Sequence, residues 1–235
     1  MIGLIIGSFV NVVGYRTVHH QSLIWPSSYC PQCQTPIKHI HKIPLVSFVL
    51  LKGKCSTCQF SISIRYPIVE LLMGCLFVIS PLVFGYTTNL LIAYTFYIFL
   101  FIVTVTDLIE MIIPNKVILL FFIIFLVEIM FFSDWLFSIV GLLVGFFLSF
   151  LIVVLSRGKM GMGDVKLLAI VGLVLGWKGM ILSFFLANML GTLFVFFMNP
   201  LYRNRPIPFA PFITAGSCVS ILFDSQLISW YYTFL

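Results

Sequence analysis

Two aspartates stand where a carboxylate could do chemistry. Asp107 directly follows the apolar run Leu90–Thr106, and Asp164 ends Gly161-Met-Gly163-Asp164, just before another apolar run. Ionisable groups beside such runs are costly and therefore indicate function. Two carboxylates that share a site do not both ionise easily, and a pair with one protonated and one ionised member can activate water against a peptide bond. The glycines permit close approach of an extended substrate strand.

The same two residues also have a structural interpretation. Asp164 can cap the N-terminus of its helix, and Asp107 can end another helix as a solvated group. The pair is separated by 57 positions (164 − 107), so spacing does not show that the side chains meet. Spacing alone therefore leaves the catalytic and the structural interpretation equally open.

The five other carboxylates are better explained by structure. They are Glu70, Glu110, Glu128, Asp134 and Asp224. Glu128 falls near the outer end of an apolar segment, so we expect it to snorkel outward. Glu70 lies just inside an apolar segment, where an ion pair with Arg65 or Lys116 is expected.

Four cysteines form two Cys-x-x-Cys pairs, Cys30/Cys33 and Cys55/Cys58, with 21 residues between the pairs. Four thiolates in this pattern predict a tetrahedral structural zinc site. A segment this short buries little core, so a bound metal would help it to fold. A reducing cytoplasm disfavours two disulfides. A redox role, an insert without metal, and a use in contacting the substrate stay open as alternatives.

The composition indicates that lipid is the solvent for most of this chain. Of 235 residues, 61% are hydrophobic and only 9% are charged, against roughly 25% charged in soluble domains. So few charges cannot cover a water-soluble globule. The net charge of +6 would suggest nucleic acid for a soluble protein. No basic run interleaves with aromatic residues here, so we predict no nucleic-acid partner.

Apolar segments predict an all-α polytopic membrane protein with about eight transmembrane helices, since a span needs about 20 apolar residues. The predicted spans are residues 2–18, 67–86, 89–106, 115–133, 136–156, 165–177, 180–199 and 208–224. The first segment has no basic residue before it, so it reads as a retained anchor rather than a secretory signal. Residues 19–66 form a small cytoplasmic zinc-knuckle insert, between the first helix (1–18) and a transmembrane core (67–235).

The basic residues predict the orientation. If Met1 lies outside and the chain alternates, twelve of the thirteen Lys and Arg residues fall on the inner side. Only Lys178 falls outside, which is a strong positive-inside pattern. Asp107 and Asp164 then lie at the same depth on the inner side of the membrane.

Several short motifs occur in a fixed order along nearly the whole chain. They are Gly7-Ser-Phe-Val-Asn11, the two cysteine pairs, Ile43-Pro44-Leu45, Arg65-Tyr-Pro67-Ile-Val-Glu70, Asp107-Leu with Ile113-Pro114-Asn115, Gly161-Met-Gly163-Asp164-Val-Lys166, and Ile207-Pro208-Phe209-Ala210-Pro211. Together these motifs resemble those of the type IV prepilin peptidases, a branch of the GxGD intramembrane aspartic proteases. Gly-x-Gly-Asp alone would be weak, whereas the ordered set is highly specific.

The resemblance implies a membrane-embedded aspartic endopeptidase of the bacterial inner (cytoplasmic) membrane. Such an enzyme cuts the leader from a prepilin or pseudopilin at the cytoplasmic face, and its partners are that substrate helix and the lipid bilayer. Asp107 and Asp164 carry over as the catalytic pair. Many members also methylate the new N-terminal amine with S-adenosylmethionine, and typical members carry the four-cysteine insert.

The chain departs from the family pattern at two places. His41-Lys42 stands where the family usually has an acidic residue, and Ala210 stands where it usually has Gly. The sequence has no glycine-rich nucleotide fingerprint, so methyl transfer is implied by the resemblance alone. Two other functions stay open: a related GxGD peptidase that acts on another signal-bearing helix, and a transporter or assembly scaffold. The last lacks support, because no broken helices occur in mirrored halves.

Overall fold

The computed structural model describes residues 1–23, 28–30, 32–37, 43–132, 134–156, 160–197 and 206–232, with the backbone alone at 132 and 224–232. The chain divides into two compact units, Met1–Tyr86 and Thr87–Leu235, and each is described by itself. Several basic residues counted for the orientation lie outside the described residues: Lys38, Lys42, Arg157, Lys159, Arg203 and Arg205. The same holds for His41.

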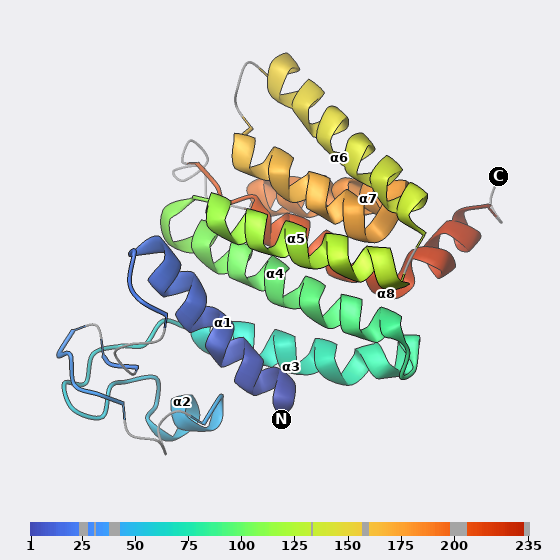
Figure 1. Cartoon of the computed structure of the whole chain (residues 1–235). Coiled ribbons are helices and arrows are strands. Elements are labelled where there is room, and N and C mark those ends of the chain that lie inside the picture. Colours follow the sequence, from blue (N-terminus) through green and yellow to red (C-terminus); the bar gives the residue numbers. More distant parts are fainter. Residues whose placement is uncertain are drawn as a thin grey trace. The chain divides into compact units, whose positions relative to one another are not determined.

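The first unit is an antiparallel pair of apolar helices, α1 (Ile2–Val18) and α3 (Arg65–Phe84) (Figure 1). Glycine lets the two backbones approach, since a Cβ on Gly7 would lie 2.8 Å from the Glu70 Cα. One turn further along, the buried Asn11 side chain donates hydrogen bonds to the carbonyl oxygens of Gly7 and Tyr66, both at 3.2 Å. Small residues with an interhelical polar contact are typical of helix pairs in membranes.

The insert between these helices contains the short helix α2 (Val46–Leu50). Just before it, the backbone N–H of Leu45 donates to Glu70 Oε2 at 2.9 Å. Leu45 has a φ of 60° and a ψ of −49°, a strained conformation for a residue with a side chain. In this unit Glu70 therefore stabilises a tight turn of the insert, and the expected ion pair with Arg65 is wrong.

The second unit contains α4 (Thr88–Glu110), α5 (Asn115–Phe132), α6 (Trp135–Leu155), α7 (Met162–Phe197) and α8 (Ala210–Tyr232). Helix α4 is the most buried, and its aromatic side chains pack against α5: the Phe99 ring lies 5.3 Å from Phe121 and 5.8 Å from Phe125. Figure 1 shows α4 and α5 side by side, and α6 along α7. Glu128 of α5 is only 8% exposed and accepts a hydrogen bond from Thr95 Oγ1 at 3.0 Å. The expectation that Glu128 snorkels outward is therefore wrong.

Helix α7 contains both predicted spans 165–177 and 180–199, which meet at a break at Gly176. Gly176 has a φ of 68° and a ψ of 179°, a conformation almost restricted to glycine. The chain reverses here. Gly179, after the break, accepts a hydrogen bond from Ser220 deep in α8, whereas Gly191 lies near Phe209 at the start of α8.

The described helices confirm an all-helical membrane protein. Four helices are long and apolar enough to cross a membrane, namely α3, α4, α6 and α7, and α1 and Ala210–Phe223 are shorter apolar helices. Counting both halves of α7, the described apolar helices number eight, as predicted: α1, α3, α4, α5, α6, two in α7, and α8. Within the described residues, β pairing is limited to two isolated bridges in the insert, Tyr29 with Pro36 and Lys54 with Ser61.

Helices α6 and α7 cross at glycines spaced four apart, Gly141 and Gly145 on α6 and Gly172 and Gly176 on α7. A methyl group on Gly172 would collide with the carbonyl oxygen of Gly141, and one on Gly145 with that of Leu168. These backbones are therefore in direct contact, as in other small-xxx-small helix pairs. The contact fixes the position of the first half of α7, which carries Asp164, against α6.

We expect Gly172→Ala to lower the free energy of unfolding by about 1–3 kcal/mol, because a backbone carbonyl cannot move aside as a side chain can. Gly191→Ala is the matched control, since a Cβ there would meet only ring atoms at 3.6 Å or more. Thermal unfolding in detergent compares the two variants. Equal melting temperatures would contradict the contact.

Candidate active site

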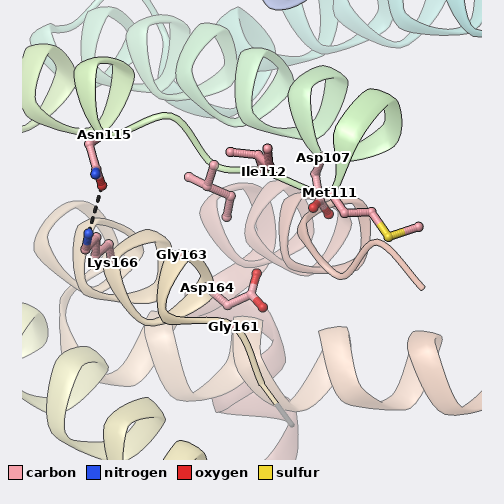
Figure 2. A pocket seen from close by; sticks show the side chains of 9 residues that line it. Asp107, Met111, Ile112, Asn115, Gly161, Gly163, Asp164 and Lys166 are labelled. Atoms are coloured by element: carbon pink, nitrogen blue, oxygen red, sulfur yellow. Dashed lines mark hydrogen bonds between the residues drawn. The ribbon is translucent and has the colours of Figure 1, made fainter. Parts of the chain in front are cut away.

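Asp107 and Asp164 line one pocket of about 240 Å³ in the second unit. Its walls come from the end of α4, the turn that follows, the start of α5 and the start of α7. The lining residues are Asp107, Met111, Ile112, Ile113, Asn115, Gly161, Gly163, Asp164 and Lys166. Figure 2 shows both carboxylates directed into this space from opposite walls. The structure thus places the two aspartates in one pocket, which their spacing in the sequence could not show.

Asp107 lies in the last turn of α4, which runs on to Glu110 rather than ending at residue 106 as predicted. The side chain is only 5% exposed. Its Oδ2 accepts a hydrogen bond from the backbone N–H of Ala210 at 2.9 Å, and the backbone of Phe209 also donates to this carboxylate. A buried carboxylate requires such partners, and here the N-terminus of α8 supplies them.

Asp164 lies in the first turn of α7, which begins at Met162, ahead of the predicted start. Its own N–H donates to the carbonyl oxygen of Gly161 at 3.1 Å, and its carboxylate accepts a hydrogen bond from the Gly161 backbone. This reciprocal pair resembles a capping box. Asp164 is therefore the third residue of its helix rather than the predicted N-cap, its carboxylate binds the free N–H before the helix, and the same side chain also faces the pocket.

Two further contacts join α7 to the segment before α5. Lys166 Nζ donates to Asn115 Oδ1 at 2.8 Å, as the dashed line in Figure 2 shows. Gly163 lies against Ile113, so that a Cβ on Gly163 would come within 3.1 Å of the Ile113 Cβ. Both contacts hold the start of α7, which carries Asp164, against the turn that follows α4, the helix that carries Asp107.

Sequence reasoning missed the Ala210 amide. A backbone N–H has no residue-type signature, and only the family motif around Pro208 and Pro211 hinted that this segment matters. The Asn115–Lys166 contact was also not predicted, although both residues belong to the family motifs that contain Asp107 and Asp164. The sequence did offer an indication of this contact, because each of the two aspartate motifs contains one further polar side chain, Asn115 in the first and Lys166 in the second.

If the two aspartates hydrolyse a peptide bond, as the family resemblance implies, we expect Gly163→Ala to lower kcat for that reaction by about tenfold to a hundredfold. Displacing a reacting group by about 1 Å can cost that much. The new methyl group would push the Ile113 side chain, and with it the turn after α4, away from the start of α7 that carries Asp164. Gly191→Ala is the matched control, since it adds the same methyl group outside the pocket, where a Cβ would meet only ring atoms at 3.6 Å or more. A kinetic assay of the two variants decides, and a larger loss in the control would contradict this account.

The four cysteines of the first unit also come together. The sulfur atoms of Cys30, Cys33, Cys55 and Cys58 all lie within 4.8 Å of one another and could hold a metal ion. The Cys30 and Cys58 sulfurs are 3.8 Å apart. Tetrahedral zinc with Zn–S bonds of about 2.3 Å requires S–S distances of about 3.8 Å. The cluster therefore fits zinc in both donor type and size.

Each cysteine pair forms a tight turn of the same kind. The N–H of Cys30 donates to the Thr35 carbonyl oxygen, and the N–H of Cys55 donates to that of Phe60. The residue after each second cysteine is a glutamine with positive φ, 55° at Gln34 and 58° at Gln59. The two turns are therefore a structural repeat, Cys-x-x-Cys-Gln, and each presents two sulfurs to the same point.

Hydrogen bonds prepare one of these thiols for a metal. The Thr35 hydroxyl donates to Cys33 Sγ at 3.2 Å. This bond, together with one from the Thr35 backbone, lowers the pKa of Cys33 to about 6. Since metals bind the thiolate and not the thiol, the turn favours the metal-binding form.

Comparison with known proteins gives matches to both units. The profile of the bacterial peptidase A24 N-terminal domain matches residues 1–84, and that of the type IV leader peptidase family matches residues 94–196. No solved structure matches the chain significantly.

Curated relatives match over nearly the full length. A protein of Bacillus subtilis (strain 168) named prepilin leader peptidase/N-methyltransferase is 38% identical over 97% of this chain and 94% of its own length. Proteins of the same name from Aeromonas salmonicida (strain A449) and Neisseria gonorrhoeae are 30% and 29% identical, over 98% and 99% of this chain and 91% and 93% of their own lengths. The chain therefore belongs to the type IV leader peptidase family, a family of peptidases, and its apolar helices make it a membrane protein.

Proposed function

We propose that this chain is an aspartic endopeptidase that removes the leader peptide from a prepilin or pseudopilin, with Asp107 and Asp164 as its catalytic pair. One observation carries the proposal: both carboxylates face a single pocket at the ends of their helices. The relatives named prepilin leader peptidase support the choice of substrate.

The pair can hydrolyse a peptide bond without a covalent intermediate. One carboxylate removes a proton from water as the water oxygen attacks the peptide carbonyl carbon, and the other carboxyl group donates its proton to the carbonyl oxygen. As the carbon–nitrogen bond breaks, a proton passes to the leaving amine. The pocket volume of about 240 Å³ is several times the roughly 30 Å³ that one water molecule occupies, and Gly161 and Gly163 leave the wall beside Asp164 without side chains.

The positive-inside pattern supports a place in the bacterial cytoplasmic membrane, with the pocket at the cytoplasmic face. The substrate's apolar helix then approaches laterally through the bilayer, so that its leader junction reaches the two aspartates. In this arrangement residues 1–18 are a membrane helix, 19–66 a cytoplasmic insert and 67–235 the peptidase core. Zinc in the insert is structural, held by Cys30, Cys33, Cys55 and Cys58.

Methylation of the new N-terminal amine is a second activity that we propose. It is supported by the names of the relatives, and the methyl group would come from S-adenosylmethionine. We assign no residue of this chain to that step.

Mass spectrometry of a prepilin co-expressed with this protein tests both activities at once. Cleavage removes the leader mass, and methylation adds one methyl group to the new N-terminus. An intact prepilin beside well-folded protein in the membrane would contradict the peptidase. A cleaved but unmethylated product would contradict the second activity alone.

A further inference from the structure

The backbone amide of Ala210 is a further working part of the site. Ala210 is the first residue of α8, and the first N–H groups of a helix have no partner within it. This amide donates to Asp107 Oδ2 at 2.9 Å. Ala210 is completely buried, so the bond is shielded from bulk water. The positive end of the α8 dipole also points at this carboxylate.

A hydroxyl pair one turn away fixes the register of this contact. Thr104 Oγ1 of α4 and Thr214 Oγ1 of α8 are 2.7 Å apart, and Thr214 also donates to the Leu100 carbonyl oxygen at 3.2 Å. Because α4 and α8 run antiparallel, Asp107–Ala210 and Thr104–Thr214 are successive contacts of one ladder. These contacts fix the position of Ala210 along the axis of α4, so that its amide lies beside the Asp107 carboxylate.

Two more hydroxyl contacts tie α8 to the second half of α7. Ser183 Oγ and Ser217 Oγ are 2.7 Å apart, and Ser220 Oγ donates to the Gly179 carbonyl oxygen at 2.8 Å. The buried residues 214, 217 and 220 follow one face of α8. Helix α8 is therefore held by hydrogen bonds to α4, which carries Asp107, and to the half of α7 that follows the break at Gly176.

The charges around Asp107 come from few groups among the described residues. Asp164 and Lys166 of α7 line the same pocket. Glu110, on the same helix as Asp107, and Lys116 of α5 are exposed to solvent. Helix α8 contributes backbone amides and hydroxyls to this region, and the turn after α4 contributes apolar side chains.

We propose that the Ala210 amide holds Asp107 ionised, which makes Asp107 the base that takes the proton from water and Asp164 the acid. The inference rests on the proposed peptidase function. Asp107 receives backbone hydrogen bonds from Ala210 and Phe209, whereas Asp164 receives one, from Gly161. Hydrogen bonds donated to a carboxylate favour its ionised form. Ala210 is thus a positioning residue that acts through its main chain.

Ala210→Pro tests the inference, because it removes the N–H at a helix position that proline favours. Ala210→Gly is the matched control, which alters the side chain but keeps the amide. We expect the proline variant to lower kcat by about tenfold and to move the acid limb of the pH–activity profile upward by about one unit or more. The glycine variant keeps the amide, so its acid limb should stay at the pH of the parent protein, whatever the change in kcat.

The direction of the shift separates the two possible assignments. If Asp107 is the ionised partner, loss of the amide makes ionisation of the pair harder and moves only the acid limb. If Asp164 is the ionised partner, only the alkaline limb moves upward, and the assignment is overturned. An unchanged profile in folded Ala210→Pro overturns the role of the amide itself.

A second pair of variants decides the matter if Ala210→Pro does not fold. Thr214→Val removes the ladder contact next to Asp107, and Ser220→Ala removes an equivalent contact at the far end of α8. We expect a smaller upward shift of the acid limb in Thr214→Val alone. Equal profiles in both variants would contradict the ladder.

Infrared absorption of protonated carboxyl groups follows the same titration in purified protein without any substrate, and Asp107→Asn identifies the Asp107 band. The Asp107 band should titrate at higher pH in Ala210→Pro than in Ala210→Gly, and coincident titrations would overturn the inference. Failure of the parent protein to cleave a prepilin would contradict the proposed function instead.

Discussion

Asp107→Asn and Asp164→Asn are each expected to lower kcat for prepilin cleavage by about a hundredfold to ten-thousandfold. Asparagine keeps the size of the side chain and can still occupy the pocket, but it neither removes a proton from water nor donates one as a carboxylic acid does. Because the two carboxyl groups are proposed to act in the chemical step, kcat should fall and KM should change little. A cleavage assay in detergent or proteoliposomes measures both constants.

The double variant sharpens this prediction. Groups that act as one unit lose their effect together, so Asp107→Asn with Asp164→Asn should be about as inactive as either single variant. Glu110→Gln is the matched control, because it makes the same chemical change at an exposed position three residues after Asp107. Full activity in either single aspartate variant would exclude that residue from the chemistry.

The candidate catalytic pair could be chosen from sequence because carboxylates are rare in this chain and costly in lipid. Their meeting could not be predicted, because it depends on how α4 and α7 pack. The half of α7 that carries Asp164 is itself placed by α6, because Gly141 of α6 and Gly172 of α7 have no side chains and their backbones are in direct contact. A glycine in an apolar run gives little indication of which helix it will meet.

The partners of buried polar groups were harder to predict than the groups themselves. Glu70 was expected to find a basic side chain, and in the first unit it binds a backbone N–H of Leu45 instead. Glu128 was expected to reach water, and it binds the hydroxyl of Thr95. In an apolar environment, any nearby donor is preferable to a long reach toward solvent. Backbone amides and hydroxyls are too common in a sequence to be singled out as such donors.

The cysteine insert was the most predictable region, since two Cys-x-x-Cys pairs define a ligand set by spacing alone. Gln34 and Gln59 nevertheless add a feature that the cysteine spacing does not predict, since they occupy equivalent positions after the two pairs. Both adopt positive φ, and the repeat is short enough to be overlooked in the sequence. Its physical cause is the tight turn that aims two sulfurs at one point.

Replacing Cys30 and Cys33 by serine together should abolish metal binding and unfold the insert. Structural zinc contributes about 10–16 kcal/mol to the folding of small zinc-binding peptides, and here only short turns and two isolated bridges are seen besides α2 in the described part of the insert. Elemental analysis of the purified parent protein should find close to one zinc per chain, and of the variant almost none. Limited proteolysis should then cut the variant within residues 19–66.

Cys75→Ser provides the control for the loss of a thiol, because Cys75 is an exposed cysteine on α3, outside the cluster. It should keep both the metal and the protease resistance of the insert. Parent protein that contains no zinc but has a protease-resistant insert would contradict a structural metal. The peptidase pocket draws all of its residues from the second unit, so the cysteine variant also shows whether cleavage depends on the insert. Cleavage that survives the loss of zinc would place the insert outside the hydrolytic chemistry and leave a role in substrate handling or methyl transfer.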